Sequence, residues 1–204
     1  MTLFTHPTPI VLVDDSEGGI RYWPDAVDTA SADSWFAALQ AGVPWTRHRR
    51  PMYDRVVDVP RLLAAWPVDD LPPALPLGAL LARVQDLAPA PYTGVGLNFY
   101  RDGQDSVAMH HDTLRTLVPR HPLTLVSLGA PRRMLLRAQH GRDRAIAVDL
   151  AHGSVLVMSH ASQLSHLHGV PKTTRQVGPR ISAVFRVRPE AARADDRYGA
   201  PSAD

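Results

Sequence analysis

Short segments rich in aliphatic and β-branched residues fill the second half of the chain, with turn-forming residues between them. They are Val95–Tyr100, Leu123–Leu128, Arg133–Leu136, Ala145–Leu150, Ser154–Met158 and Ile181–Val187. Pairs such as His152-Gly153 and Gly178-Pro179 supply the intervening turns. Segments this short, at this spacing, are typical of antiparallel sandwiches and jelly rolls. We therefore expect an α+β protein whose core is an antiparallel β-structure.

The region before these segments predicts two helices that pack against the sheet. In the first, Ser31–Gln40, apolar residues recur at helical spacing and Gly42 marks the end. In the second, Leu77–Leu87, the leucines and Val84 repeat on one face after a proline-rich lead-in. Both helices are expected to flank the β-structure on its N-terminal side.

The length of the chain favours a single domain, because 204 residues can bury one substantial core. We expect residues 1–93 to form an N-terminal extension, residues 94–189 the β-structured core, and residues 190–204 a flexible tail. No apolar run approaches the roughly 20 residues that cross a bilayer, and the N-terminus lacks a secretory pattern. These features predict a cytoplasmic protein without a membrane segment. We also expect a monomer without an obligate protein partner.

A metal site built from histidine and carboxylate is the main functional prediction from the residues. The chain has ten histidines and no cysteine, which excludes disulfides and zinc–thiolate sites. The segment His110-His111-Asp112 reads as extended chain, in which residues two apart point to the same side. His110 and Asp112 can therefore bind one metal together, whereas His111 faces away.

A third ligand has to come from a distant segment, and residues 164–171 offer His166 and His168. These histidines are two residues apart, so side-chain periodicity alone leaves the choice between them open. Two imidazoles and one carboxylate on one face of an octahedral metal leave positions for a bidentate oxoacid and for dioxygen. This arrangement is typical of non-haem iron oxygenases.

The last predicted strand carries two arginines, Arg180 and Arg186, on one face, because they are six positions apart. A guanidinium group forms two parallel hydrogen bonds to a carboxylate. Arg180 is therefore suited to bind the distal carboxylate of a dicarboxylic co-substrate at the mouth of a barrel. The alternative is an edge strand whose arginines are solvated.

Between about Trp45 and Arg188 the sequence resembles the AlkB family of iron- and 2-oxoglutarate-dependent nucleic-acid dealkylases. The resemblance is densest in three ordered blocks. These blocks are NFYRDGQDS at 98–106, HHD at 110–112, and a longer stretch with LAHGS at 150–154, HGVP at 168–171, GPR at 178–180 and FR at 185–186. The resemblance implies that the core is a double-stranded β-helix.

The resemblance also implies roles for individual residues. It makes His110, Asp112 and His168 the iron ligands, which settles the choice between the two histidines of residues 164–171. It makes Asn98 and Tyr100 hydrogen-bonding partners of 2-oxoglutarate.

Two arginines complete the implied co-substrate site. Arg180 becomes the partner of the distal carboxylate of 2-oxoglutarate. Arg186 lies near the metal end of the co-substrate, where we assign it to both catalysis and co-substrate binding.

The segment from Trp45 to Tyr53 resembles the nucleotide-recognition lid of the family. Its two aromatic residues can stack on a base that has been lifted from its helix, although ordinary core packing is the alternative. The net charge of +2 does not by itself require a polyanionic partner. If the lid binds nucleic acid, the candidate phosphate contacts are Arg47, Arg49, Arg50, Lys172 and Arg175.

Two positions depart from the pattern of the family. A carboxylate that reads the exocyclic amine of the damaged base commonly stands two residues beyond the metal aspartate, where this chain has Leu114. An apolar side chain cannot accept that hydrogen bond. Ser182 stands where the last strand usually has asparagine, which alters how the co-substrate is held.

Together these inferences predict an Fe(II)- and 2-oxoglutarate-dependent dioxygenase that uses O2 to dealkylate N-alkylated bases in DNA or RNA, as in the repair of alkylation damage. Leu114 and the small net charge favour one alternative, a hydroxylase or demethylase of a protein or small molecule. Two rivals belong to other classes. A non-catalytic binding module is expected to lack a metal ligand or Arg180, and zinc hydrolysis gives Arg180 no role.

Overall fold

The computed structural model describes residues 8–52, 55–140 and 144–193, and it describes only the backbone of residues 50–52, 55–58 and 193. One set of strands comprises β1 (Ile10–Val13), β2 (Ile20–Trp23), β3 (Thr46–Met52), β4 (Arg55–Pro67), β5 (Gly94–Tyr100), β7 (Leu123–Gly129), β10 (Ser154–Met158) and β12 (Arg180–Arg186). A second set comprises β6 (Val107–His110), β8 (Arg132–Ala138), β9 (Ile146–Leu150) and β11 (His166–Val170). The helices are α1 (Thr29–Gly42), α2 (Leu77–Leu87), α3 (His160–Ser165) and α4 (Glu190–Arg193), with 3₁₀ turns η1 (Val68–Asp70) and η2 (Leu114–Thr116).

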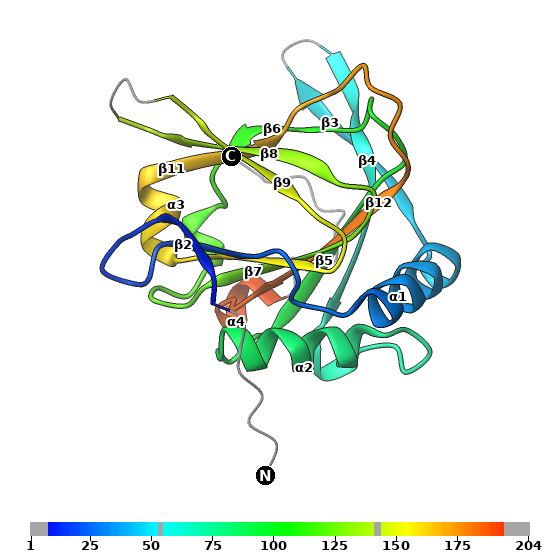
Figure 1. Cartoon of the computed structure of the whole chain (residues 1–204), viewed down its shortest axis with the longest axis horizontal. Coiled ribbons are helices and arrows are strands. Elements are labelled where there is room, and N and C mark those ends of the chain that lie inside the picture. The colour runs from blue at the N-terminus through cyan, green and yellow to red at the C-terminus, as the bar shows by residue number, and fades with distance from the viewer. Residues whose placement is uncertain (1–7, 53–54, 141–143, 194–204) are drawn as a thin grey trace.

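The strands form two antiparallel sheets. The larger has eight strands in the order β1-β2-β10-β7-β12-β5-β4-β3, and the smaller has four in the order β6-β11-β8-β9. Helices α1 and α2 lie along one side of the larger sheet, and the smaller sheet lies on its other side (Figure 1). The predicted α+β class with an antiparallel core is therefore confirmed.

Side-chain alternation along the larger sheet produces two hydrophobic cores. On β12, Ile181, Ala183 and Phe185 belong to the core shared with α1 and α2. Val184 belongs to the core that the two sheets share, together with Met134 of β8. The other even-numbered residues of β12 therefore point into the space between the sheets, where polar groups have to find partners.

The two predicted helices are confirmed. Helix α2 has the predicted bounds, and α1 extends two residues beyond the prediction at each end. The side chain of Asp28 caps α1 by accepting a hydrogen bond from the backbone N–H of Ser31 at 2.9 Å, which satisfies a donor that the first turn leaves free.

The predicted strands after residue 94 are confirmed with small shifts of their ends, but the prediction for the N-terminal extension was incomplete. Strands β1 to β4 all join the larger sheet, whereas only helices and a lid were expected there. Strand β2 alternates the buried Ile20 and Tyr22 with the partly exposed Arg21, a pattern too short to identify from the sequence. At the other end, residues Glu190–Arg193 of the predicted flexible tail form α4, and the rest of the tail lies outside the described residues.

The hairpin of β3 and β4 extends past the edge of the larger sheet (Figure 1). Only the segment Leu62–Pro67 of β4 pairs with β5, whereas Arg55–Asp58 pairs with β3 alone. The hairpin is therefore held by the sheet at one end. Within the described ranges no helix is long and apolar enough to span a membrane.

Phe185 offers a test of the core beneath the helices. Its side chain is fully buried, so Phe185→Ala is expected to lower the free energy of unfolding by about 3–5 kcal/mol through lost burial and a residual cavity. The matched control is Val11→Ala, because Val11 is 51% exposed and its loss is expected to change stability by less than about 0.5 kcal/mol. Urea unfolding followed by circular dichroism measures both, and equal losses would contradict this account of the core.

Candidate metal centre and co-substrate pocket

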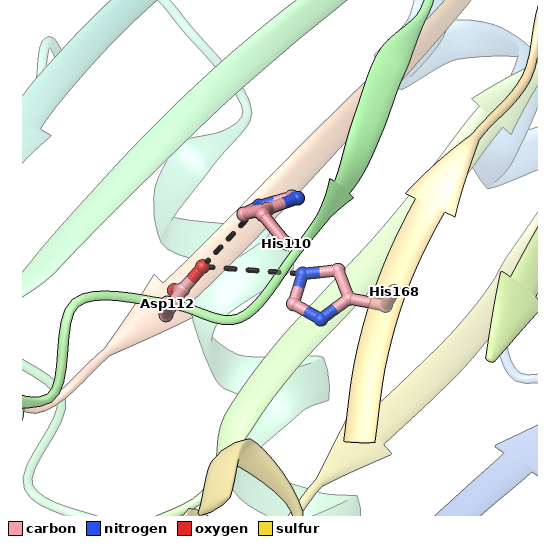
Figure 2. A group of neighbouring side chains, drawn as sticks. All are labelled: His110, Asp112 and His168. Carbon is pink, nitrogen blue, oxygen red and sulfur yellow. Dashed lines mark ion pairs between the residues drawn. The ribbon is translucent and has the colours of Figure 1, made fainter. Parts of the chain in front are cut away.

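The pairing of β6 with β11 brings the predicted metal ligands together. His110 and His168 are direct partners in the antiparallel register, and Asp112 lies two residues beyond the end of β6. The Nε2 atom of His110 lies 3.7 Å from Oδ1 of Asp112, and that of His168 lies 3.9 Å from the same oxygen (Figure 2). One ligand atom from each residue fits within 4.8 Å of the others, which is the spacing that one metal ion requires.

Hydrogen bonds orient the imidazole of His110 for metal binding. Its Nδ1 lies 2.9 Å from the carbonyl oxygen of Ala108, and since a carbonyl only accepts, Nδ1 carries the proton. The lone pair of the ring is then on Nε2, the atom that faces Asp112. This is the tautomer in which a histidine binds a metal through Nε2.

Arg186 holds the carboxylate of Asp112 in its ligand form. Its Nε donates a hydrogen bond of 2.5 Å to Oδ2, which leaves Oδ1 on the side of the two histidines. Burial raises the pKa of Asp112, but the charge and the hydrogen bond of Arg186 outweigh it and lower that pKa from 3.8 to about 2. Arg186 thus contacts a metal ligand directly, at the metal end of the pocket where the sequence predicted it.

His168 is also in its ligand form near neutral pH. Burial, and to a lesser extent the nearby ionisable imidazole of His110, lower the pKa of His168 from 6.5 to about 4. The ring is therefore neutral, with a lone pair available for a metal. His166, the alternative ligand, lies outside this group, and its Nδ1 instead lies 2.9 Å from the hydroxyl oxygen of Ser165.

Gln163 supports the metal centre, although no sequence pattern singled it out. Its Oε1 accepts a hydrogen bond of 3.1 Å from the backbone N–H of Asp112, and its side chain is buried. Ser159 caps the N-terminus of α3, the short helix that carries Gln163, by accepting from the N–H of Ser162. A glutamine on a six-residue helix has no periodicity or motif that would mark it as functional.

A cavity of about 100 Å³ opens beside the metal ligands and is lined by both sheets. The polar residues that line it, apart from the three metal ligands, are Arg61, Asn98, Tyr100, Ser182 and Arg186. Leu125, Met134, Met158 and Val184 supply part of the apolar wall. Two of the residues predicted to bind 2-oxoglutarate, Asn98 and Tyr100, are therefore in the same cavity as the metal ligands.

Arg180 is fully buried and its hydrogen bonding is incomplete. Its Nε donates to the hydroxyl of Ser127 at 2.9 Å, and its guanidinium carbon lies 5.1 Å from the centre of the Tyr100 ring. Its Nη1 and Nη2 are buried atoms without a hydrogen-bond partner in the described part of the chain. Burial lowers the pKa of Arg180 from its usual range, as expected for a cation that has lost water without gaining an anion.

The chemistry of Arg180 fits a bound dicarboxylate. Two parallel N–H groups without an acceptor in the described part of the chain match the two oxygens of a carboxylate. The ring of Tyr100 lies against this guanidinium and also lines the cavity. Leaving a buried cation without a partner costs several kcal/mol, which a ligand carboxylate offsets when it binds. The residues present thus fit 2-oxoglutarate as well as a metal.

The residues predicted to bind the substrate are not among the described residues that line the metal cavity. The ring of Trp45 packs 5.0 Å from that of Phe99, and its Nε1 donates to the carbonyl of Gln40, so it has the core contacts of the alternative interpretation. Arg49 is exposed on β3, and Leu114 is half-buried in η2 without lining the cavity. Tyr53 lies outside the described residues, as does the side chain of Arg50.

The protein has two antiparallel sheets with a cavity between them, and two imidazoles and one carboxylate lie in the wall of that cavity. These features define the class of the protein. It is a non-haem iron oxygenase. Residues 63–193 match the model of the 2OG-Fe(II) oxygenase superfamily, and the chain belongs to this family. Its cofactor is Fe(II), its co-substrate is 2-oxoglutarate, and His110, Asp112 and His168 form its metal triad.

The relatives of the chain include AlkB homologues. DNA oxidative demethylase ALKBH2 of Homo sapiens is 32% identical over 119 residues, which span 52% of this chain and 45% of that protein. Alpha-ketoglutarate-dependent dioxygenase alkB homolog 3 of Mus musculus is 28% identical over 183 residues, which span 80% of this chain and 64% of that protein. The chain therefore spans less than two thirds of the length of either relative.

Two solved structures support the fold. The structure of OsALKBH1 superimposes with a TM-score of 0.61 at 18% identity, over 83% of this chain and 98% of that chain. An oxidoreductase of the 2OG-Fe(II) oxygenase family from Burkholderia pseudomallei superimposes with a TM-score of 0.56 at 18% identity, over 82% and 85%. At this identity the likeness supports the arrangement of strands and helices alone.

The two histidines of β11 provide a matched test of the metal centre. His168→Ala removes a ligand and is expected to weaken binding of Fe(II) or Co(II) by more than the roughly 10- to 100-fold typical for the loss of an outer partner. His166→Ala is expected to leave metal binding unchanged, since His166 lies outside the triad. Metal content after dialysis and the visible spectrum of the Co(II) protein measure both, and equal losses in the two variants would contradict the assignment.

Proposed function

We propose that this enzyme oxidatively removes N-alkyl groups from bases of DNA or RNA and thereby reverses alkylation damage. The observation that carries the proposal is a cavity lined by the His-Asp-His triad and the Asn98/Tyr100 pair, with the guanidinium of Arg180 behind the ring of Tyr100 and two of its nitrogens unsatisfied. The choice of nucleic acid as substrate is supported by the relative named a DNA oxidative demethylase. We further infer that the two sheets constitute a double-stranded β-helix.

When bound together with dioxygen, Fe(II) and 2-oxoglutarate supply an oxidation that hydroxylates a C–H bond of the substrate while 2-oxoglutarate is converted to succinate and carbon dioxide. The protein has to hold and orient the reactants. Arg180 binds the distal carboxylate, with its own guanidinium held by Ser127 and the face of Tyr100. Arg186 keeps Asp112 ionised, so that Oδ1 remains a ligand.

The alkyl group of the substrate enters from the side of the β3–β4 hairpin, which we propose to be the recognition lid. Hydroxylation of an N-alkyl carbon gives a hemiaminal, which breaks down to an aldehyde and the unmodified base without further catalysis. The apolar wall that includes Leu125, Met134 and Val184 excludes water from the reacting carbon.

The experiment that tests the proposal supplies iron, ascorbate, 2-oxoglutarate and an oligonucleotide with one N-methylated base. We expect equal amounts of succinate, formaldehyde and restored base, measured by mass spectrometry. Succinate formed without any restored base would remove nucleic acid as the substrate while leaving the dioxygenase activity in place.

A second candidate function is hydroxylation of a protein or small molecule. It is favoured by Leu114, which offers no acceptor for an exocyclic amine, and by a net charge of only +2. Screening pools of peptides, metabolites and oligonucleotides for stimulated succinate release distinguishes the two functions.

Arg180→Met separates a ligand-binding arginine from a structural one. We expect the free energy of unfolding of the ligand-free protein to be unchanged or raised by about 1–4 kcal/mol, because a buried cation with two unsatisfied nitrogens is removed. Adding 2-oxoglutarate with Mn(II) is expected to raise the thermal midpoint of the wild type by linkage but not that of the variant.

The matched control is Arg132→Met. Arg132 is also buried, but it donates to the backbone carbonyls of Asp102, Asp105 and Pro171. Its loss leaves these acceptors unsatisfied and is expected to destabilise the ligand-free protein. If Arg180→Met destabilised the protein as much as the control and kept the 2-oxoglutarate response, the role of Arg180 would be structural.

Arg49→Glu tests whether the hairpin binds nucleic acid. Arg49 is exposed on β3, and loss of one phosphate contact is expected to lower the slope of log affinity against log salt by about 0.7 to 0.9. Fluorescence anisotropy with a labelled oligonucleotide at several salt concentrations measures the slope. The control is Arg133→Glu on β8, where the native side chain pairs with Asp149, and a control that weakened binding equally would count against the hairpin.

A further inference from the structure

Arg61 lines the metal cavity but has no part in the machinery described above. It lies on β4, on the strand that continues from the β3–β4 hairpin into the larger sheet. Its side chain is half-buried. Arg61 is thus a charged residue in the cavity wall, on the strand that leads from the hairpin.

The guanidinium of Arg61 is held in a fixed orientation. Its Nε donates to Oδ1 of Asn98 at 2.7 Å, and its Nη1 lies 3.4 Å from the carbonyl oxygen of Ser106. Its Nη2 donates to no group in the described ranges, and it is not among the fully buried atoms that lack a partner. A positioned donor with access to solvent therefore remains for a ligand.

The hydrogen bond from Arg61 also fixes the orientation of the Asn98 side-chain amide. Because Oδ1 of Asn98 accepts from Arg61, the donor end of the amide is directed elsewhere, and its Nδ2 lies 3.5 Å from the hydroxyl oxygen of Ser182. Among the described residues that line the cavity, Asp112 is the only carboxylate, and Arg186 and the metal site already engage it. The wall near Arg61 thus offers donors and positive charge.

We propose that Arg61 makes the enzyme select neutral N-alkylated bases that carry a ring carbonyl beside the alkylated nitrogen, such as N1-alkylguanine and N3-alkylthymine. This inference rests on the proposed function. Alkylation of a lactam or imide nitrogen replaces a proton and leaves the base neutral, with a carbonyl oxygen next to the alkyl group. That oxygen accepts a charge-assisted hydrogen bond from a guanidinium.

The same geometry disfavours cationic substrates. Alkylation at N1 of adenine or N3 of cytosine gives a base that is positively charged near neutral pH. The adenine product has no carbonyl beside the alkylated nitrogen, whereas the cytosine product keeps its O2 carbonyl. Placing this charge near Arg61 in a site of low dielectric constant is unfavourable, because like charges repel more strongly there than in water. Discrimination against N1-alkyladenine therefore comes from a missing attraction and a repulsion, and discrimination against N3-alkylcytosine from the repulsion, all by one side chain.

The test compares oligonucleotides that differ in a single base: N1-methylguanine, N3-methylthymine, N1-methyladenine or N3-methylcytosine. For the wild type we expect kcat/KM to be at least about 10-fold higher for the two neutral bases, as one charge-assisted hydrogen bond allows. Arg61→Gln is expected to reduce this ratio by about 10-fold or more. Arg61→Lys retains the charge without the planar fork and is expected to give an intermediate ratio.

The ratio of kcat/KM for neutral bases to that for cationic bases is taken within each variant. A loss of folded or metal-loaded protein lowers both values equally and therefore leaves the ratio unchanged. A bond that only tied β4 to β5 would change all four rates together and leave the ratio as in the wild type. An unchanged ratio in Arg61→Gln, or a wild type that prefers the cationic bases, overturns the role of Arg61 and leaves dealkylation standing. If all four oligonucleotides are inert while succinate still forms, the proposed function fails and this inference fails with it.

Discussion

The register between β6 and β11 is the constraint on which the site depends. Direct pairing of His110 with His168 places both rings on the same face of the smaller sheet, toward the cavity. A slip of one residue would turn His168 to the opposite face, since successive side chains in a strand alternate. The metal centre is thus a consequence of strand pairing, and the hydrophobic alternation that stabilises the sheets also positions the ligands.

Much of the fold was predictable because hydrophobic periodicity is a local property. Six of the eight strands between Gly94 and Arg186, all except β6 and β11, and helix α2 were predicted from such patterns. Strand β3, with the sequence TRHRRPM, has no such alternation, because it pairs in a hairpin at the edge of the sheet. Its structure depends on its partner strand, and a local pattern cannot report that.

The residues of the candidate site also fall into two groups, those that the sequence identifies and those that it does not. His110, Asp112 and Arg180 could be predicted because metal ligands and carboxylate partners are of few chemical types at definite spacings. Gln163 and Arg61 could not, since each acts through a hydrogen bond to a residue that is distant in sequence. Residues that position others have no motif, and only coordinates identify them.

The buried charges near the cavity are compensated in two different ways, and the difference separates a contact within the protein from a group that awaits a ligand. Arg186 and Asp112 neutralise each other within the protein, so the ligand set is formed before a metal binds. Arg180 is left with two unsatisfied donors, which costs stability in the ligand-free protein.

The position of Arg61 links the two ends of the cavity. Strand β4 begins in the hairpin that we propose as the lid, and through Arg61 it contacts Asn98, which we assign to 2-oxoglutarate. Under the proposed function, a base that contacts Arg61 and a co-substrate that contacts Asn98 therefore lie at the two ends of one hydrogen bond. Any effect of one ligand on the affinity of the other is reciprocal, because both belong to one thermodynamic cycle. One arginine then connects the choice of base with the support of the co-substrate.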